Sequence, residues 1–124
     1  MAIQNHYFKK VSKQDVTRSF VINKSALDDF FCLGLYANGD EDSIIMHYPS
    51  GEAIATRVVM KQDPRILLVE RPFEIGQIIH FKRITAFEFT FHVLSNADHE
   101  RISQFCNNKN FYLSIINPLN RDGH

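Results

Sequence analysis

The chain of 124 residues has no tryptophan, only two cysteines, and few glycines and prolines. Cys32 and Cys106 lie far apart, form no Cys-x-x-Cys motif, and each follows a phenylalanine. Buried free thiols are therefore expected rather than a disulfide. No apolar run approaches the roughly 20 residues that cross a membrane, and the first residues lack the apolar core of a signal peptide. We expect a soluble protein of a reducing compartment, with no membrane partner.

Motifs of catalysis and metal binding are also missing. The sequence has no Gly-rich phosphate loop, no GxSxG and no HExxH. None of the histidines has zinc-ligand spacing. His80 and His92 are expected to face each other across a hairpin as an ordinary sheet pair. The acidic run at 40–42 lacks the later bidentate glutamate of a calcium loop, so a solvated turn is expected. We predict that the domain is not an enzyme and holds no metal or cofactor.

The composition is that of an ordinary globular protein, with 44% hydrophobic and 23% charged residues. A chain of this length buries about 70% of the surface that its unfolded form exposes, so it can fold without disulfides. We expect one domain over residues 1–124. Its core should span 7–116, and 117–124 should be a tail or the start of a linker.

Short apolar segments separated by turn residues predict a mainly β fold. Strands are expected at 7–11, 20–22, 43–48, 53–60, 65–70, 77–84, 87–94 and 111–116. A helix is expected to start at Ser25, and Asn96 or Asp98 should cap another that runs through Phe105. Seven or eight strands with a helix after the second indicate a β-barrel rather than a βαβ fold.

The most aromatic strand, at 87–94, suggests two different functions. Phe87, Phe89 and Phe91 alternate with polar residues. Such a ladder can stack nucleic-acid bases, but the alternation is typical of a barrel core. We expect all three rings in the core.

Charge is segregated along the chain although the net charge is zero. Basic residues predominate at 9–24 and 57–71, whereas 25–56 contains acids and no lysine or arginine. This pattern predicts one basic and one acidic face, and chance segregation in a short chain is the alternative. A basic face would suit nucleic acid.

Three segments, in the correct order, give the chain a family resemblance. Residues 8–30, FKKVSKQDVTRSFVINKSALDDF, contain a strand, a turn, a strand ending in VINK and a helix ending in Phe. This order resembles the opening of the plant B-three DNA-binding domain, with its (T/S)xSDV turn and (V/I)IPK strand end. Residues 51–60 resemble the family's Gx(V/I)WxFRYSY strand, with Arg57 at the arginine. Residues 73–83 resemble its LxxGDxxxFxR hairpin.

The resemblance covers residues 7–94, with Asn23 in place of the usual Pro and Gln77 in place of Asp. The family's second helix is almost absent, which is similar to the bacterial branch. Members of that branch are effector or specificity domains of restriction endonucleases, such as the EcoRII N-terminal type. The resemblance implies a seven-stranded open pseudobarrel with one or two short helices.

The same resemblance implies a function. It implies sequence-specific binding of double-stranded DNA in the major groove by two arms, at residues 12–19 and 60–65. The expected partner besides DNA is a nuclease domain or subunit of a restriction-modification system, in the bacterial cytoplasm. No catalytic residue is implied for the domain itself.

The side chains of the arms suit different parts of the DNA. Arginine bonds guanine O6 and N7 together, glutamine pairs with adenine or phosphate, and aspartate accepts from cytosine N4 or caps its own backbone. For Asp15 we favour the role in the turn. The candidate base contacts are Arg18, Arg65, Gln14, Gln62, Asp15 and Asp63.

Lysines and hydroxyls suit phosphate, which positions a protein on DNA without specifying sequence. For Arg57, in mid-strand, a contact with DNA and an ion pair on the barrel surface are both open. The candidate phosphate contacts are Lys9, Lys10, Lys13, Lys24, Lys61, Ser12, Thr17 and Ser19.

Two other functions remain as alternatives. A protein-interaction barrel would use the acidic run at 40–42 and an apolar edge, and would not bind DNA. A small-ligand barrel would need an internal cavity, which the many phenylalanines are expected to fill. A reader of modified bases is a variant within the DNA-binding class.

Overall fold

The computed structural model describes residues 3–119 and consists mainly of β-strands. The N-terminal half contains β1 (His6–Lys10), α1 (Lys13–Thr17), β2 (Phe20–Val21), α2 (Lys24–Ala26), a π-helical turn (Leu27–Phe31), β3 (Glu41–His47) and β4 (Ala53–Lys61). The C-terminal half contains β5 (Asp63–Ile66), β6 (Ile78–Arg83), β7 (Glu88–Val93), α3 (Asn96–Cys106) and β8 (Phe111–Ser114). No helix within 3–119 is long and apolar enough to cross a membrane.

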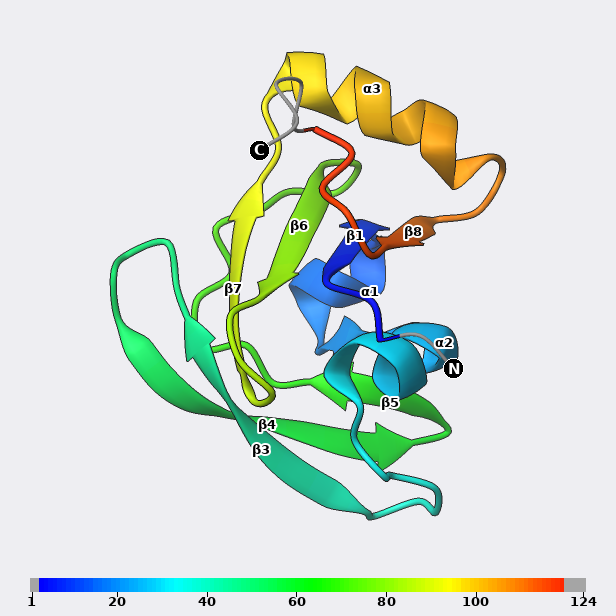
Figure 1. The fold of residues 1–124 in the computed structure, drawn as a ribbon. Coiled ribbons are helices and arrows are strands. Elements are labelled where there is room, and N and C mark those ends of the chain that lie inside the picture. The colour runs from blue at the N-terminus through cyan, green and yellow to red at the C-terminus, as the bar shows by residue number, and fades with distance from the viewer. Residues whose placement is uncertain (1–2, 120–124) are drawn as a thin grey trace.

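One sheet holds the eight strands of the described chain, in the order β2-β5-β4-β3-β7-β6-β1-β8. Its pairs are antiparallel except β3 with β7. The sheet curls into an open half-barrel, with α3 running across one end between β7 and β8 (Figure 1). The mainly β prediction is confirmed, but the strand count is eight rather than seven because β8 adds an edge beside β1.

Aromatic side chains fill the half-barrel. Tyr7, Phe20, Phe81, Phe89 and Phe91 are at most 1% exposed. The π-helical turn closes the open side, because its Phe30 and Phe31 rings pack against the Phe89 ring with centroids 5.2 and 5.0 Å apart. Burial of these rings supplies the main driving force for folding.

Phe87 was expected in this core but is 62% exposed. The tight turn at 84–88 explains the difference. The N–H groups of Ile84 and Thr85 both donate to the Glu88 carbonyl, so β7 begins only at Glu88. Phe87 therefore lies at the tip of the hairpin, outside the alternating pattern.

One of the two thiols and one strand also differ from the prediction. Cys106 is buried as expected, but Cys32 is exposed because it ends the π-helical turn in the left-handed conformation. The strand expected at 65–70 is β5, Asp63–Ile66. Pro64 does not break it, because the ladder needs its carbonyl, which accepts from the Ile22 N–H at 2.8 Å. The segment 67–77 that follows contains no helix or strand.

The remaining boundaries shift by a few residues. The expected cap of α3 was Asn96 or Asp98, and the observed cap is Ser95, whose hydroxyl accepts from the Asp98 N–H at 3.3 Å. β8 ends at Ser114 rather than at residue 116. Of the predicted tail at 117–124, residues 120–124 lie outside the described chain.

Candidate nucleic-acid interface

Two segments form the candidate interface. The N-terminal arm is residues 12–19, between β1 and β2, and the C-terminal arm is residues 60–65, around the turn between β4 and β5. The N-terminal arm was expected as a loop, but most of it is the short helix α1. The arms meet because β2 pairs with β5, where Phe20 lies opposite Ile66 and Val21 opposite Arg65.

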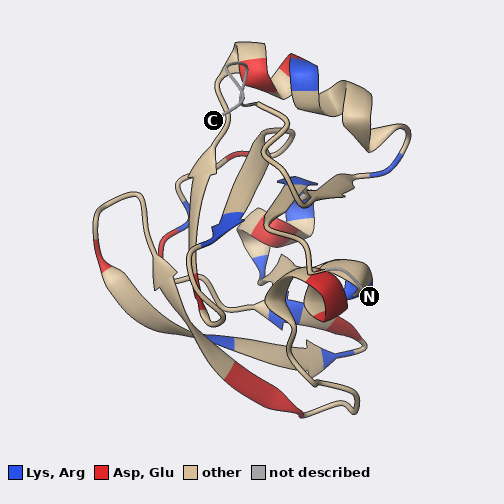
Figure 2. Cartoon of the chain, viewed as in Figure 1, with Lys and Arg blue, Asp and Glu red and all other residues tan. Residues whose placement is uncertain are grey.

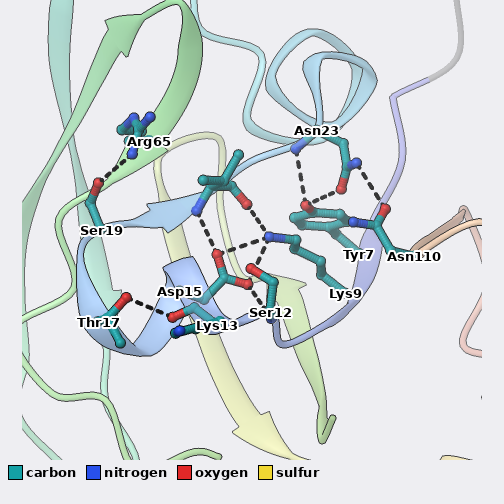
Figure 3. A network of polar contacts seen from close by, with 11 residues as sticks. Tyr7, Lys9, Ser12, Lys13, Asp15, Thr17, Ser19, Asn23, Arg65 and Asn110 are labelled. Carbon is teal, nitrogen blue, oxygen red and sulfur yellow. Dashed lines mark hydrogen bonds and ion pairs between the residues drawn. The ribbon is translucent and has the colours of Figure 1, made fainter. Parts of the chain in front are cut away.

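A buried ion pair fixes the base of the N-terminal arm. The Lys9 ammonium donates to both Asp15 carboxylate oxygens, at 3.0 and 2.8 Å, and to the Val21 carbonyl at 2.7 Å (Figure 3). Asp15 also accepts from the backbone N–H groups of Ser12 and Val21, both at 2.9 Å. The carboxylate therefore joins the start of α1 to β1 and β2.

This arrangement corrects two predicted DNA contacts. The exposed fractions of Lys9 and Asp15 are 2% and 0%, so neither side chain can reach DNA. Burial lowers the pKa of the Lys9 ammonium, and the hydrogen bond and charge of Asp15 oppose that shift. The bonds from Asp15 to the backbone N–H groups of Ser12 and Val21 agree with the turn role that we favoured for it. Both residues shape the arm from inside.

Arg65 connects the two arms. Its Nη1 atom donates to the Ser19 hydroxyl at 3.1 Å. With the Gln14 amide oriented so that its oxygen faces Arg65, that oxygen accepts from Nη1 at 2.6 Å and Nη2 at 3.0 Å. The Nε atom is buried with no hydrogen-bond partner in the described chain. The structure thus brings three predicted site residues together, and the guanine contact of Arg65 stays a prediction.

Other side chains of the arms are free to reach a partner. Lys13, Thr17 and Arg18 are exposed and, with Gln14, line a shallow hollow on the N-terminal arm. Thr17 uses its hydroxyl as a donor to the Lys13 carbonyl at 2.9 Å. At the tip of the C-terminal arm the exposed residues are Lys61, Gln62 and Asp63.

The C-terminal arm has a fixed conformation. Gln62 has a φ of 26°, and its N–H donates to the Asn38 side-chain oxygen at 2.9 Å. The turn is therefore held from outside as well as by the β4–β5 ladder. Its side chains project from a rigid support, which favours specific recognition.

Three other predicted contacts lie beside the arms or away from them. Lys10 is exposed at the end of β1, just before the N-terminal arm. Lys24 is exposed and pairs with Asp28 at 2.9 Å. For Arg57, a DNA contact and a surface ion pair were both possible, and the structure contains the ion pair, with Glu41 of β3.

Charge is only partly separated, because the acidic start of β3 pairs with the end of β4, where the N–H of Met60 in the C-terminal arm donates to the Asp40 carbonyl at 2.8 Å. Acidic Glu41 and Asp42 lie at the start of β3, whereas lysine and arginine residues predominate on the arms (Figure 2). Asp63 is the exposed acid of the C-terminal arm. The basic surface is local, because the chain as a whole has zero net charge.

Sequence reasoning missed two sets of residues near the arms. Arg71, from the segment after β5, donates to the Arg18 carbonyl and adds positive charge there. Asn23 accepts from the Tyr7 hydroxyl at 2.6 Å and donates to the Asn110 side-chain oxygen at 3.2 Å (Figure 3). Burial raises the pKa of Tyr7. The basic cluster at 57–71 could have pointed to Arg71. No feature of the sequence near Asn23 predicts its contact with Asn110.

The buried histidines form a structural cluster. His80 lies opposite His92, as predicted, and its Nε2 atom lies 2.9 Å from His6 Nδ1. Burial, with the neighbouring positive charges second, lowers the pKa of His80 to about 3, so its ring is neutral near pH 7. Within residues 3–119, no group of three or more His, Cys, Asp or Glu side chains is arranged to hold a metal ion.

Comparison with known proteins places the fold. No family model matches the sequence, and no curated protein sequence matches it. Among solved structures, the N-terminal domain of Helicobacter pylori LlaJI.R1 is similar, with a TM-score of 0.75 and 18% sequence identity. The match covers 91% of this chain and 99% of that chain. At this identity the likeness concerns the fold alone, which this chain and that domain share over the matched residues.

Proposed function

We propose that this domain binds double-stranded DNA sequence-specifically in the major groove, as the specificity domain of a restriction-modification system. The observation that carries the proposal is the pair of rigid arms, joined side by side through Arg65, with cationic and amide side chains free at their tips. The shared fold with the LlaJI.R1 N-terminal domain, a restriction-modification component, supports the same conclusion.

The major groove admits a two-stranded ribbon or a short helix, and both are present in the arms. Arg18 is the base reader we favour, because it is exposed at the C-cap of α1 and its guanidinium makes no hydrogen bond within residues 3–119. Gln62 at the opposite tip is suited to adenine. Lys13 and Lys61 are suited to phosphates on either side, which would set the register of the arms on the duplex.

In the function we propose, the domain has no catalytic role of its own. Cleavage would come from a nuclease domain or subunit, in the cytoplasm of a bacterium. On this proposal the domain acts as the B-three resemblance implies: it selects a sequence and recruits a nuclease to it.

The test begins with selection of bound duplexes from a random pool at about 0.15 M salt, a concentration at which non-specific contacts are weak. We expect a short enriched motif. Arg18→Ala should relax selection at one position and cost about 1–3 kcal/mol there. Lys13→Ala should weaken binding to all sequences alike. It should also reduce the slope of log K against log salt concentration by about 1.

Lys82→Ala is the matched control, because Lys82 is exposed on β6 opposite His6, at the end of β1 remote from the arms. It should leave both motif and affinity unchanged. Binding without any enrichment would contradict sequence-specific readout.

One observation favours a second function, a protein-interaction barrel. Ile84 and Phe87 at the β6–β7 tip are 50% and 62% exposed, and Ile116 after β8 is 75% exposed. An exposed apolar surface of this kind is typical of protein contacts. Absence of DNA binding even at low salt would decide for this function.

A further inference from the structure

The unit formed by α3 and β8 extends the sheet beyond the strands that carry the arms. β8 pairs with β1, where Phe111 lies opposite Lys9 and Ser114 opposite His6. The turn between α3 and β8, residues 107–110, therefore lies at the end of β1 that leads into the N-terminal arm. In the sequence this turn is 88 residues from that arm, since 107 − 19 = 88.

The turn has a defined conformation. Asn107 and Asn108 are both left-handed, with φ of 49° and 73°, a conformation that asparagine tolerates better than most residues. The Lys109 N–H donates to the Cys106 carbonyl at 3.0 Å, which closes the end of α3. All four residues are exposed, so three amide groups and one ammonium face solvent from a fixed backbone.

Hydrogen bonds anchor the turn to the base of the arms. The Asn110 carbonyl accepts from the Lys10 N–H at 2.8 Å, and its side-chain oxygen accepts from Asn23 at 3.2 Å. Asn23 in turn lines a groove with Gln62 and Asp63 of the C-terminal arm. The turn, the N-terminal arm and the C-terminal arm thus converge on the same end of the half-barrel.

The charge of the turn is positive. Lys109 Nζ lies 5.9 Å from the centroid of the Phe111 ring, and Lys10 is exposed on the neighbouring strand. The acids of α3, Asp98 and Glu100, lie in the first half of an 11-residue helix. The second half of the helix, about 9 Å from Glu100 to Cys106 at 1.5 Å per residue, separates them from the turn. Figure 2 shows the basic residue on the loop beyond α3.

We propose that the 107–110 turn is a third DNA-contacting element, which binds phosphates next to the segment read by the two arms. Lys109 supplies the charge, Lys10 supplements it, and the asparagine amides donate to phosphate or sugar oxygens. The turn extends the bound length of the duplex without adding base specificity. This inference rests on the proposed DNA-binding function and deepens it.

The test compares duplexes of two lengths that carry the selected motif, one trimmed to the motif and one with about six further base pairs on each side, roughly half a helical turn. Lys109→Ala should weaken binding to the long duplex about fivefold at 0.15 M salt, the contribution of one phosphate contact. The slope of log K against log salt should fall by about 1. Binding to the trimmed duplex should not change. Lys109→Arg should retain wild-type behaviour.

Lys82→Ala is again the matched control and should match the wild type on both duplexes. Phosphate ethylation interference on the long duplex should show a contact outside the motif that Lys109→Ala abolishes. If the wild type binds the motif and Lys109→Ala binds the long duplex with unchanged affinity and slope, the third element is refuted while the arms stand. If the wild type binds no duplex, the proposed function itself fails and this inference fails with it.

Discussion

The Lys9 ammonium and the Asp15 carboxylate meet in the interior, beneath the N-terminal arm. Removal of one member of such a buried pair leaves an unpaired buried charge, at a cost of about 3–5 kcal/mol. Asp15→Ala should therefore lower the free energy of unfolding by that amount, measured by urea denaturation. The backbone N–H groups of Ser12 and Val21 lose their acceptor as well, so the arm should lose its fixed conformation.

A double variant separates the charge from the packing. Lys9→Met combined with Asp15→Ala removes both charges, so the loss of stability should be smaller than the sum of the two single losses. Asp63→Ala, which changes the exposed aspartate of the other arm, should shift stability by less than about 0.5 kcal/mol. A loss below about 1 kcal/mol for Asp15→Ala would show that the pair does not hold the arm.

At the scale of elements, Arg65 is the bridge between the arms. Arg65→Ala removes the donors to Ser19 and Gln14, so the N-terminal arm should open more often. Amide hydrogen exchange at 12–19 should accelerate, while the β3–β4 hairpin keeps its protection. Arg65→Lys should give a similar result, because an ammonium lacks the planar fork of donors.

Arg57→Ala is the matched control in the same sheet. Arg57 pairs with Glu41 on an exposed surface, and such pairs contribute about 0–1 kcal/mol. Exchange at 12–19 should be unchanged in that variant. The losses of DNA-binding free energy for Gln14→Ala and Arg65→Ala should be non-additive, because each variant removes the same Gln14–Arg65 hydrogen bonds. Unchanged exchange in the arm of Arg65→Ala would rule out the bridge.

The elements also show what the sequence can predict. Alternating apolar residues and turn signals located the β3–β4 and β6–β7 hairpins, because these patterns are local. Helix α1 was missed because its five residues, KQDVT, are too few to show an apolar period. The start of β5 was predicted at 65 rather than at Asp63 because Pro64 has no N–H for a sheet ladder, although the strand uses its carbonyl.

The candidate site was predictable to the same extent. Clustered basic residues indicated the segments 9–24 and 57–71, and the family resemblance implied an arm within each of them. The contacts that organise the arms are not local: Arg65 and Ser19 are 46 residues apart, and Asn23 and Asn110 are 87 apart. Such pairs depend on strand order, which the sequence pattern does not specify. The same reason explains why the 107–110 turn was not recognised as part of this end of the barrel.

At the scale of the whole molecule, the zero net charge limits the long-range attraction that speeds association with DNA, whereas the affinity depends on the local charge of the arms. The arms carry local positive charge, but Glu41 and Asp42 on β3 oppose the long-range attraction to DNA. Glu41→Gln combined with Asp42→Asn changes the net charge from 0 to +2, since two acids become neutral. Both side chains are exposed, so the fold should be little affected.

We expect this double variant to associate with DNA faster than the wild type at about 20 mM salt, because the net field then attracts the duplex. The difference should vanish near 1 M salt, where the Debye length is about 3 Å. Stopped-flow association on the selected duplex would measure both rates. The selected motif should stay the same, because β3 contributes no predicted base contact. A changed motif would mean that the acids of β3 exclude some sequences directly, and the reading surface would then extend beyond the arms to the β3–β4 ribbon.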